Sequence, residues 1–293
     1  MIVESTIVPS DSHTVAALDD TDQNVVASWL AQRPRTTTRS YQRAWRYLQL
    51  ATGGVELRAI QLHHLQAYAQ SLRGMKLSSQ VTFIAAIQSL FGFACKIGYL
   101  PVNLGTLLRR PALPVNIAER IVGEADIRRM LAMTTKPRDA TLLRLAYVSG
   151  LRIAELSGLR WRCFAPRENG AVLSVIRKGG RVRHIFLPDY IAAAVAALRH
   201  GAVDSAPIFL SRNHNALSVN TMHTIVKQAA RRAGLPPTFS MHWCRHAHAS
   251  HAMDRGAPVH VVQQTLGHVS LATTCRYVHC KPGASSAQFI AAC

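Results

Sequence analysis

The second half of the sequence carries an ordered series of cationic and polar side chains whose types suit chemistry on a phosphate. In chain order, the series consists of Arg152, Glu155, Lys178, His242, Arg245, His268 and Tyr277. Arginine offers a planar fork of donors that matches phosphate oxygens, and lysine and histidine can move protons. The chain has neither GxxxxGK[ST] nor GxGxxG after an expected strand, and no acidic cluster typical of a two-metal nuclease. Any phosphate chemistry must therefore use cations that side chains supply.

Taken singly, each member of this series has a commoner structural explanation. An arginine followed three residues later by glutamate, as in Arg152 and Glu155, is usually a helix salt bridge. A lysine beside two glycines, as Lys178 is, usually lies in solvent. The order and spacing of the whole series therefore carry the information.

In this order and spacing, the series resembles the catalytic signature of the tyrosine recombinase family, which includes phage-type integrases and Xer-type resolvases. The resemblance covers residues 120–283, and Thr38-Arg39-Ser40-Tyr41 and Gly98–Asn103 are similar to the family's core-binding domain. The Xer-like branch is the most similar, because the domains are compact and the ending is short. The resemblance implies a site-specific recombinase that cleaves and rejoins duplex DNA through a 3′-phosphotyrosine intermediate and a Holliday junction. It implies no metal, no ATP and no other cofactor.

The resemblance also assigns roles on the scissile phosphate. Arg152 and Arg245 match the two arginines that hold its non-bridging oxygens, which gain charge in the transition state. His268 matches a histidine that adds a donor to the same oxygens. Tyr277 matches the nucleophile, and the phosphotyrosine it forms keeps the bond energy for religation.

Three further roles follow from the same resemblance. Lys178 matches the hairpin lysine that protonates the departing 5′ oxygen as general acid, and His242 matches the proton acceptor for the nucleophile. We expect Glu155 to brace the arginines and their helix without taking part in the reaction.

A group of histidines around Cys244 offers a competing interpretation as a zinc site. His242 and His246 share a helix face, but Cys244 lies about 200° around the helix from His242. No CxxC or HxxxC supplies further ligands. We therefore expect no metal, and we expect His246, His248 and His251 to be packing and surface residues.

The charge of the chain indicates a polyanionic partner. The 293 residues include 34 Lys+Arg and 15 Asp+Glu, which gives 34 − 15 = +19. Because 48% of residues are hydrophobic, a disordered chain is excluded. A folded protein this basic most often meets nucleic acid, and a ribosome-associated or merely basic protein is the alternative.

Signals for secretion or membrane insertion are missing from the sequence. No Lys or Arg precedes Arg33, so the acidic N-terminus lacks a basic leader region. No run of about 18 apolar residues predicts a spanning helix. The six cysteines form no CxxC pair, which argues against a disulfide framework. We therefore expect a cytoplasmic protein with no membrane partner.

Helical periodicity and linker composition predict two domains. Residues 1–21 form an acidic lead-in, and residues 22–100 form a helical, SAM-like core-binding domain. A basic linker with three prolines follows over 101–119, and residues 120–293 form the catalytic domain with its tail. The expected fold class is mainly α with a small β-hairpin or sheet. The resemblance implies that the two domains form a C-shaped clamp.

In the first domain, the apolar pattern predicts helices over 36–51, 61–72 and 77–97. The first of these carries an apolar stripe (Tyr41, Trp45 and Leu48) and, on another face, an arginine stripe (Arg39, Arg43 and Arg46). The arginine stripe suits DNA phosphates, and a solvated basic face is the alternative. The other arginines expected to bind DNA are Arg109 and Arg110 in the linker and Arg181 beside the hairpin turn.

In the second domain, helices are expected to position the candidate residues around one hairpin. Strands are predicted over 172–176 and 184–187, joined by a turn with Gly179-Gly180. Arg152 is expected at the start of a helix. The other predicted helices run over 124–133, 138–149, 190–199, 219–233, 242–254 and 258–266.

The resemblance implies that four protomers assemble on DNA, either of one protein or paired with a second recombinase. Residues 284–293 are either a frayed terminus or a short helix that docks on the neighbouring subunit. Two rival functions remain: a DNA-binding or architectural protein without turnover, and a type IB topoisomerase-like enzyme.

Overall fold

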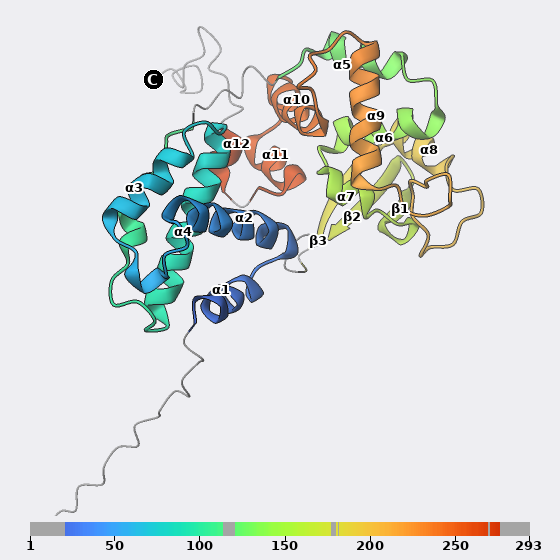
Figure 1. The fold of residues 1–293 in the computed structure, drawn as a ribbon. Helices are drawn as coiled ribbons and strands as arrows, with labels where there is room; N and C mark the ends of the chain where they lie inside the picture. Colours follow the sequence, from blue (N-terminus) through green and yellow to red (C-terminus); the bar gives the residue numbers. More distant parts are fainter. Residues whose placement is uncertain (1–20, 114–120, 177–179, 181, 269, 276–293) are drawn as a thin grey trace, which may run out of the picture. The chain divides into compact units, whose positions relative to one another are not determined.

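A computed structural model of the protein describes residues 21–113, 121–176, 180, 182–268 and 270–275 (Figure 1). The chain divides into two units, Met1–Pro114 and Val115–Cys293, and each has its own buried core. Helices dominate both units, and the second unit adds a small antiparallel sheet. The expected fold class, mainly α with a small sheet, is therefore confirmed. The tail 284–293 lies outside the described residues.

Thr21 and Gly53 mark the start of the first helix and the end of the second in the first unit. The Thr21 hydroxyl accepts a hydrogen bond from the Asn24 backbone N–H at 3.4 Å and caps the first helix. Gly53, in a left-handed conformation with φ 68°, ends the second. The elements are α1 (Asp22–Ala31), α2 (Arg35–Thr52), the 3-10 turn η1 (Leu57–Ala59), α3 (Leu62–Ser71), α4 (Leu77–Lys96) and the 3-10 turn η2 (Leu104–Leu107).

The core of the first unit is centred on α2 and α4. Leu48 of α2 and Leu90 of α4 are fully buried, and the two helices are in contact. Trp29 of α1 stacks on Tyr41 of α2, with ring centroids 5.1 Å apart. The apolar stripe of α2 therefore faces the core, and the arginine stripe is exposed.

Helix α4 is, within the part of the chain that the structure describes, the helix that is long and apolar enough to cross a membrane. Its mean hydropathy reaches 1.3 although it is not an unbroken apolar run. Phe83, Ile87 and Phe91 of this helix are buried in the core of the first unit. Because a core helix meets the same criteria of length and composition, α4 is weak evidence of a membrane span.

The first part of the expected linker packs on α4. Gln88 Nε2 of α4 donates a hydrogen bond to the Leu108 carbonyl at 2.7 Å, and the Leu108 side chain is buried. Gly105 lies so close to α4 that a Cβ there would come within 2.8 Å of Phe91 Cβ. The packing of the first unit thus continues past residue 100, because apolar side chains after the proline return to its core.

The second unit combines helices with the sheet, and each helix predicted for it is present with ends shifted by at most a few residues. Its helices are α5 (Glu124–Ala132), α6 (Pro137–Ser149), α7 (Ile153–Ser157), the 3-10 turn η4 (Trp161–Cys163), α8 (Asp189–Ala196), α9 (Val219–Arg232), α10 (Met241–Asp254), α11 (Val259–Leu266) and α12 (Leu271–Cys275). Figure 1 shows α9 running alongside α5 and α7.

The sheet is antiparallel with strand order β1 (Phe164–Arg167), β2 (Gly170–Ile176) and β3 (Val182–Pro188). The predicted hairpin is confirmed as β2 and β3, with Val175 opposite Arg183. Side chains of β3 alternate between exposed and buried, as a strand with one covered face requires. Strand β1 was not predicted, because a four-residue segment that contains a proline carries no strand pattern.

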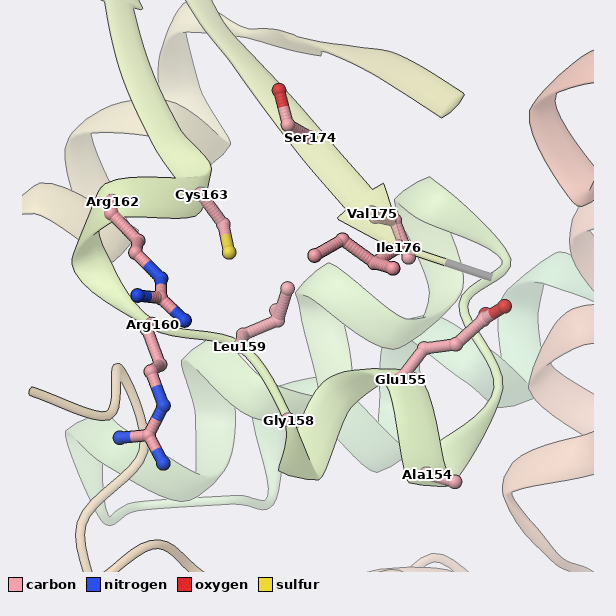
Figure 2. Close-up of a pocket in the computed structure, with 10 residues that line it drawn as sticks. All are labelled: Ala154, Glu155, Gly158, Leu159, Arg160, Arg162, Cys163, Ser174, Val175 and Ile176. Carbon is pink, nitrogen blue, oxygen red and sulfur yellow. The ribbon is translucent and has the colours of Figure 1, made fainter. Parts of the chain in front are cut away.

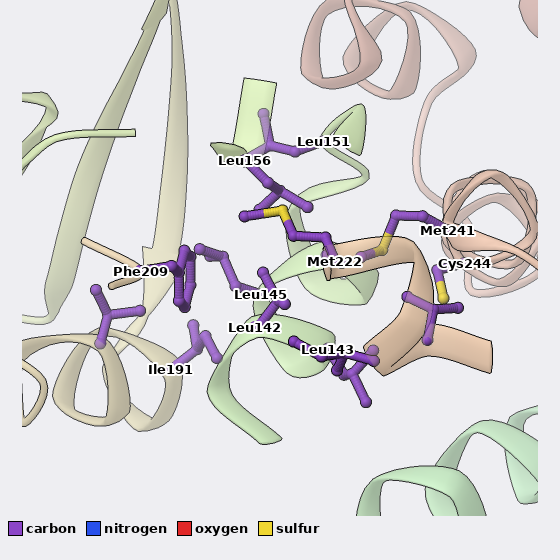
Figure 3. Close-up of a cluster of buried hydrophobic side chains, with 14 of the residues drawn as sticks. Leu142, Leu143, Leu145, Leu151, Leu156, Ile191, Phe209, Met222, Met241 and Cys244 are labelled. Carbon is purple, nitrogen blue, oxygen red and sulfur yellow. The ribbon is translucent and has the colours of Figure 1, made fainter. Parts of the chain in front are cut away.

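A large hydrophobic cluster joins these elements (Figure 3). Leu142 and Leu145 of α6 lie at its centre, with Met222 of α9, Ile191 of α8 and Cys244 of α10 around them. The cluster fixes the end of α6 against α7 and α10. The candidate residues lie at this junction.

Candidate active site

The side chain of Arg245 on α10 is buried where two other helices end, and Arg245 is only 1% exposed. Its Nη1 donates a hydrogen bond to the Gly150 carbonyl at 2.6 Å, and its Nη2 donates to the Leu266 carbonyl at 2.7 Å. Gly150 follows the end of α6 and Leu266 ends α11, so both carbonyls lie at the negative ends of helix dipoles. These contacts fix the plane of the guanidinium and stabilise its charge.

Gly150 makes this arrangement possible because it turns the chain after α6 in a left-handed conformation with φ 58°. A Cβ at this position would lie 2.5 Å from Leu266 Cδ2 and 3.0 Å from His248 Cδ2. Both the backbone conformation and the close approach therefore require glycine. The turn aims the Gly150 carbonyl at Arg245.

We expect Gly150→Ala to lower the free energy of unfolding by about 2–4 kcal/mol, because the clash with Leu266 adds to left-handed strain. Chemical denaturation measures this loss. Gly234→Ala is the matched control, since Gly234 has φ 68° and open space around its Cβ position. That control should lose only about 1–2 kcal/mol. Equal losses in the two variants would show that the packing against Leu266 is not restrictive.

Arg152 precedes α7, and the Glu155 carboxylate holds it there. The Arg152 backbone N–H donates to Glu155 Oε2 at 2.8 Å, and Arg152 Nη1 donates to Oε1 at 3.2 Å. Arg183 of β3 donates from Nη2 to the same Oε2 at 2.8 Å. The side chain of Glu155 is 12% exposed and that of Arg152 is 44% exposed. The carboxylate thus fixes the base of Arg152, while the Arg152 side chain remains partly exposed to solvent.

A pocket between the start of α7 and the start of α10 includes both candidate arginines. It is lined by Leu151, Arg152, Ile153, Ala154, His223, Ser240, Met241, His242 and Arg245. His242 lies in the first turn of α10, and its ring centroid is 4.3 Å from that of His246. The fold thus brings Arg152, His242 and Arg245 to one pocket from distant parts of the sequence.

His268 follows α11, where Gly267 turns the chain in a left-handed conformation with φ 66°. Its Nδ1 lies 2.8 Å from the Thr274 Oγ1 of α12. Burial, followed by the positive charges of Arg245 and Arg152, lowers the pKa of His268 to about 4. The ring is therefore neutral at pH 7 and lies in the field of both arginines.

The other histidines of α10 pack against its neighbours. His248 donates a hydrogen bond from Nδ1 to the Tyr147 carbonyl at 2.9 Å, and burial lowers its pKa to about 4. His251 Nδ1 lies 2.9 Å from the Tyr147 hydroxyl, and His246 is buried. Among the residues that the structure describes, no three His, Cys, Asp or Glu side chains are placed to hold one metal ion.

A second pocket lies beside Glu155, between α7, η4 and β2 (Figure 2). Glu155 stands at one end, and Arg160 and Arg162 stand at the other. Leu159, Val175 and Ile176 lie between them. This pocket shares Ala154 with the pocket of Arg245, but Glu155 lines only this pocket, and Arg152 and Arg245 line only the other.

A model of the phage integrase family matches residues 118–283, which are more than half of the chain. The chain belongs to the phage integrase family. It is a tyrosine site-specific recombinase, so the predicted family is confirmed.

Curated relatives place this recombinase beside the Xer proteins, as predicted. Tyrosine recombinase XerC of Xylella fastidiosa strain 9a5c is 30% identical over 242 residues, which cover 79% of this chain and 80% of the relative. Tyrosine recombinase XerC of Xanthomonas axonopodis pv. citri strain 306 is 30% identical over 223 residues, covering 74% and 72%.

Solved structures share the fold at lower identity. XerH site-specific recombinase, in a pre-cleavage complex with its difH substrate, has a TM-score of 0.70 and 19% identity, covering 83% of this chain and 77% of that chain. The Tn1549 transposon integrase, in complex with transposon right end DNA, has a TM-score of 0.72 and 17% identity, covering 92% and 98%.

The described members of the candidate series lie together in the second unit of the recombinase. Arg152, His242 and Arg245 line one pocket, Glu155 supports Arg152 from behind, and His268 interacts with the arginines. The remaining predicted residues of this unit, Lys178, Arg181 and Tyr277, lie outside the described residues.

The arginines expected to bind DNA in the first unit are exposed. Within the arginine stripe, the Arg43 guanidinium lies 5.8 Å from the centre of the Phe83 ring. In the expected linker, Arg110 Nε donates to Gln88 Oε1 at 2.6 Å, and Arg109 is exposed. All of these side chains present charge at the surface of the recombinase.

Three residues of the site were not singled out from the sequence: Arg183, Gly150 and Thr274. Arg183 could have been found from the strand pattern. It shares the buried face of β3 with Ile185, and a charged residue on that face needs a partner. The contacts of the other two depend on which helix ends meet in the fold. The local sequence carries no sign of them.

Proposed function

We propose that the recombinase holds the scissile phosphate of its DNA site in the pocket of Arg152, His242 and Arg245, with His268 beside it. The observation that carries this proposal is the fixed guanidinium of Arg245. In the transition state, the non-bridging oxygens of a phosphodiester gain negative charge. A guanidinium that is already oriented by two carbonyls stabilises that charge without reorganising. Arg152, whose side chain is partly exposed, adds the second cation.

The contact between His268 and Thr274 supports a donor role for the histidine. At pH 7 the ring is neutral, so only one of its nitrogens carries a proton. We infer that the Thr274 hydroxyl donates to Nδ1 across the 2.8 Å contact, which leaves the proton on Nε2. His268 then donates from Nε2 to a phosphate oxygen.

In the proposed reaction, the Tyr277 phenol oxygen attacks the phosphorus and the bond to the 5′ oxygen breaks. His242 accepts the phenol proton, and Lys178 gives a proton to the departing 5′ oxygen. The 5′ hydroxyl of a partner strand then attacks the 3′-phosphotyrosine, which releases Tyr277 and joins the strands. The phosphotyrosine conserves the bond energy, so no ATP is needed. Side-chain cations supply the charge stabilisation that a metal would otherwise give.

We further propose that four protomers exchange two pairs of strands through a Holliday junction, either alone or with a second recombinase. The complexes of XerH with difH and of the Tn1549 integrase with transposon DNA support duplex DNA as the partner. The first unit would act as the core-binding domain (22–100), joined through the linker 101–119 to the catalytic domain (120–293). The place of action is the cytoplasm, with no membrane partner.

Replacing all three arginines of the arginine stripe with glutamine should weaken DNA binding for every sequence and reduce its salt dependence. The slope of log K against log salt is negative, and each phosphate that is no longer neutralised makes it shallower by about 0.9. The magnitude of the slope should therefore decrease by about 2–3. Fluorescence anisotropy over a salt series measures it. Arg73→Gln, an exposed arginine after α3, is the control and should leave the slope nearly unchanged. An unchanged slope in the triple variant would mean that the stripe is only a solvated face.

Sequencing the DNA that becomes covalently attached to the protein in its host tests the proposed function directly. Lysis in SDS preserves a phosphotyrosine adduct and removes all other bound protein. We expect one recurrent cleavage position within a pair of related sites. Scattered positions, together with plasmid relaxation that needs no preferred sequence, would instead identify a type IB topoisomerase-like activity. Site-specific binding with no attached DNA would identify an architectural protein.

A further inference from the structure

Arg183 occupies a position in β3 where the fold calls for an apolar side chain. The strand alternates, with Val182 and His184 exposed and Arg183 and Ile185 buried. Its partner across the sheet, Val175, is also buried. Arg183 is 8% exposed, so its charge is largely removed from water. A buried cation is strongly unfavourable unless an anion pairs with it.

That anion is Glu155, and Arg183 shares it with Arg152. Arg183 Nη2 and the Arg152 backbone N–H both donate to Oε2 at 2.8 Å, while Arg152 Nη1 donates to Oε1 at 3.2 Å. Both Glu155 and Arg183 are nearly buried, whereas Arg152 extends into the pocket. One carboxylate therefore joins the sheet to the residue that begins α7.

The sharing has an electrostatic consequence for Arg152. A glutamate paired with a single arginine forms a pair with no net charge, so the pair as a whole attracts a phosphate only weakly. With two arginines on one carboxylate, the group carries a formal charge of +1. The influence of Arg183 extends to His268, whose pKa it helps to lower after burial, Arg245 and Arg152. Arg183 therefore contributes to the positive field of the pocket from within the core.

We propose that Arg183 is a positioning residue for DNA cleavage: by holding the Glu155 carboxylate, it orients Arg152 and leaves the group of Arg152, Glu155 and Arg183 with net positive charge beside the scissile phosphate. This inference rests on the proposed function of the pocket. Arg183 touches neither the phosphate nor the nucleophile. It acts through Glu155 and Arg152.

Arg183→Met tests the proposal in the full-length chain, because methionine suits a buried strand position and removes the cation and its hydrogen bond to Glu155. In single-turnover assays on a suicide substrate carrying the protein's site, we expect cleavage to slow by about 10- to 100-fold. The affinity for the same site should change by less than about threefold, because Arg152 still reaches the DNA. Arg183→Lys, which restores the charge and one donor, should recover part of the rate.

A substrate with a neutral scissile group separates this role from a merely structural one. A methylphosphonate replaces one non-bridging oxygen with a methyl group, so the negative charge that Arg152 must offset is absent. On this substrate, the difference between Arg183→Met and the unchanged chain should shrink to less than about threefold. Equal defects on the phosphate and methylphosphonate substrates would overturn the proposal, because misfolding or loose packing slows both alike.

Two control variants complete the experiment. Arg167→Met removes an exposed arginine from β1 of the same sheet and should cleave both substrates normally. Ile185→Ala weakens β3 at the next buried position, and its defect should be the same on both substrates. If the unchanged chain forms no Tyr277-linked adduct, the proposed function fails. If it forms that adduct and Arg183→Met cleaves the phosphate substrate at the normal rate, only the role of Arg183 fails.

Discussion

A Tyr277→Phe variant should bind its DNA site with unchanged affinity and form no covalent protein–DNA adduct. The substitution removes one phenol oxygen and nothing else, so the cations that hold the phosphate are retained. Without that oxygen, no other side chain of the proposed mechanism forms a bond to phosphorus. We therefore expect adduct formation to fall below detection, a larger change than any other single substitution should produce. The measurement is denaturing electrophoresis of the protein after incubation with a labelled suicide substrate.

Tyr190→Phe provides the matched control for this experiment. Tyr190 is an exposed tyrosine of α8, 66% accessible to solvent, and its loss of a hydroxyl should leave adduct formation at the normal level. An SDS-resistant adduct that persists in Tyr277→Phe would show that another residue is the nucleophile. Peptide mapping of that adduct would then identify the residue.

The elements of the fold were predictable where a periodic pattern reports burial directly. The apolar spacing around Phe83, Ile87 and Phe91 predicted helix α4 to within one residue, and the run around the two glycines predicted the hairpin. Strand β1 and the 3-10 turn η2 were not predicted. Both are short segments that become ordered only because a neighbour, β2 or α4, supplies their hydrogen bonds or buried surface.

The sequence predicted which residues belong to the candidate site, but it did not predict how their side chains are arranged. Order and spacing along the chain identified Arg152, His242, Arg245 and His268, because the residue types in this succession match a known signature. The structure adds what the sequence cannot express: the contacts that set their directions. The Gly150 carbonyl meets Arg245 across 95 residues, and Arg183 meets Glu155 across 28. Such pairings depend on how helices and strands pack: the strand pattern indicates that a buried Arg183 needs a partner, but it does not say which residue that partner is.

Arg245 shows why the geometry matters, since its two Nη groups are each held by a backbone carbonyl. A lysine at this position offers one compact ammonium in place of a planar fork. The Gly150 and Leu266 carbonyls lie at the ends of α6 and α11. The ammonium cannot donate to both of them and to a phosphate at the same time. A methionine fills the space but leaves both buried carbonyls without donors, at about 1–3 kcal/mol each. Arg245→Lys is therefore the better probe of chemistry, and Arg245→Met the better probe of stability.

We expect Arg245→Lys to slow single-turnover cleavage by at least about 10³-fold. The substitution removes the guanidinium donors that two carbonyls hold in a fixed orientation toward the phosphate. DNA affinity should fall by less than about tenfold, since most binding energy comes from phosphates elsewhere along the site. Arg255→Lys, at the exposed end of the same helix, is the control and should cleave normally. Cleavage by Arg245→Lys within about tenfold of the normal rate would mean that charge alone suffices at this position. The two helix-end carbonyls would then serve to stabilise the buried cation, and the direction of the fork would not contribute to catalysis.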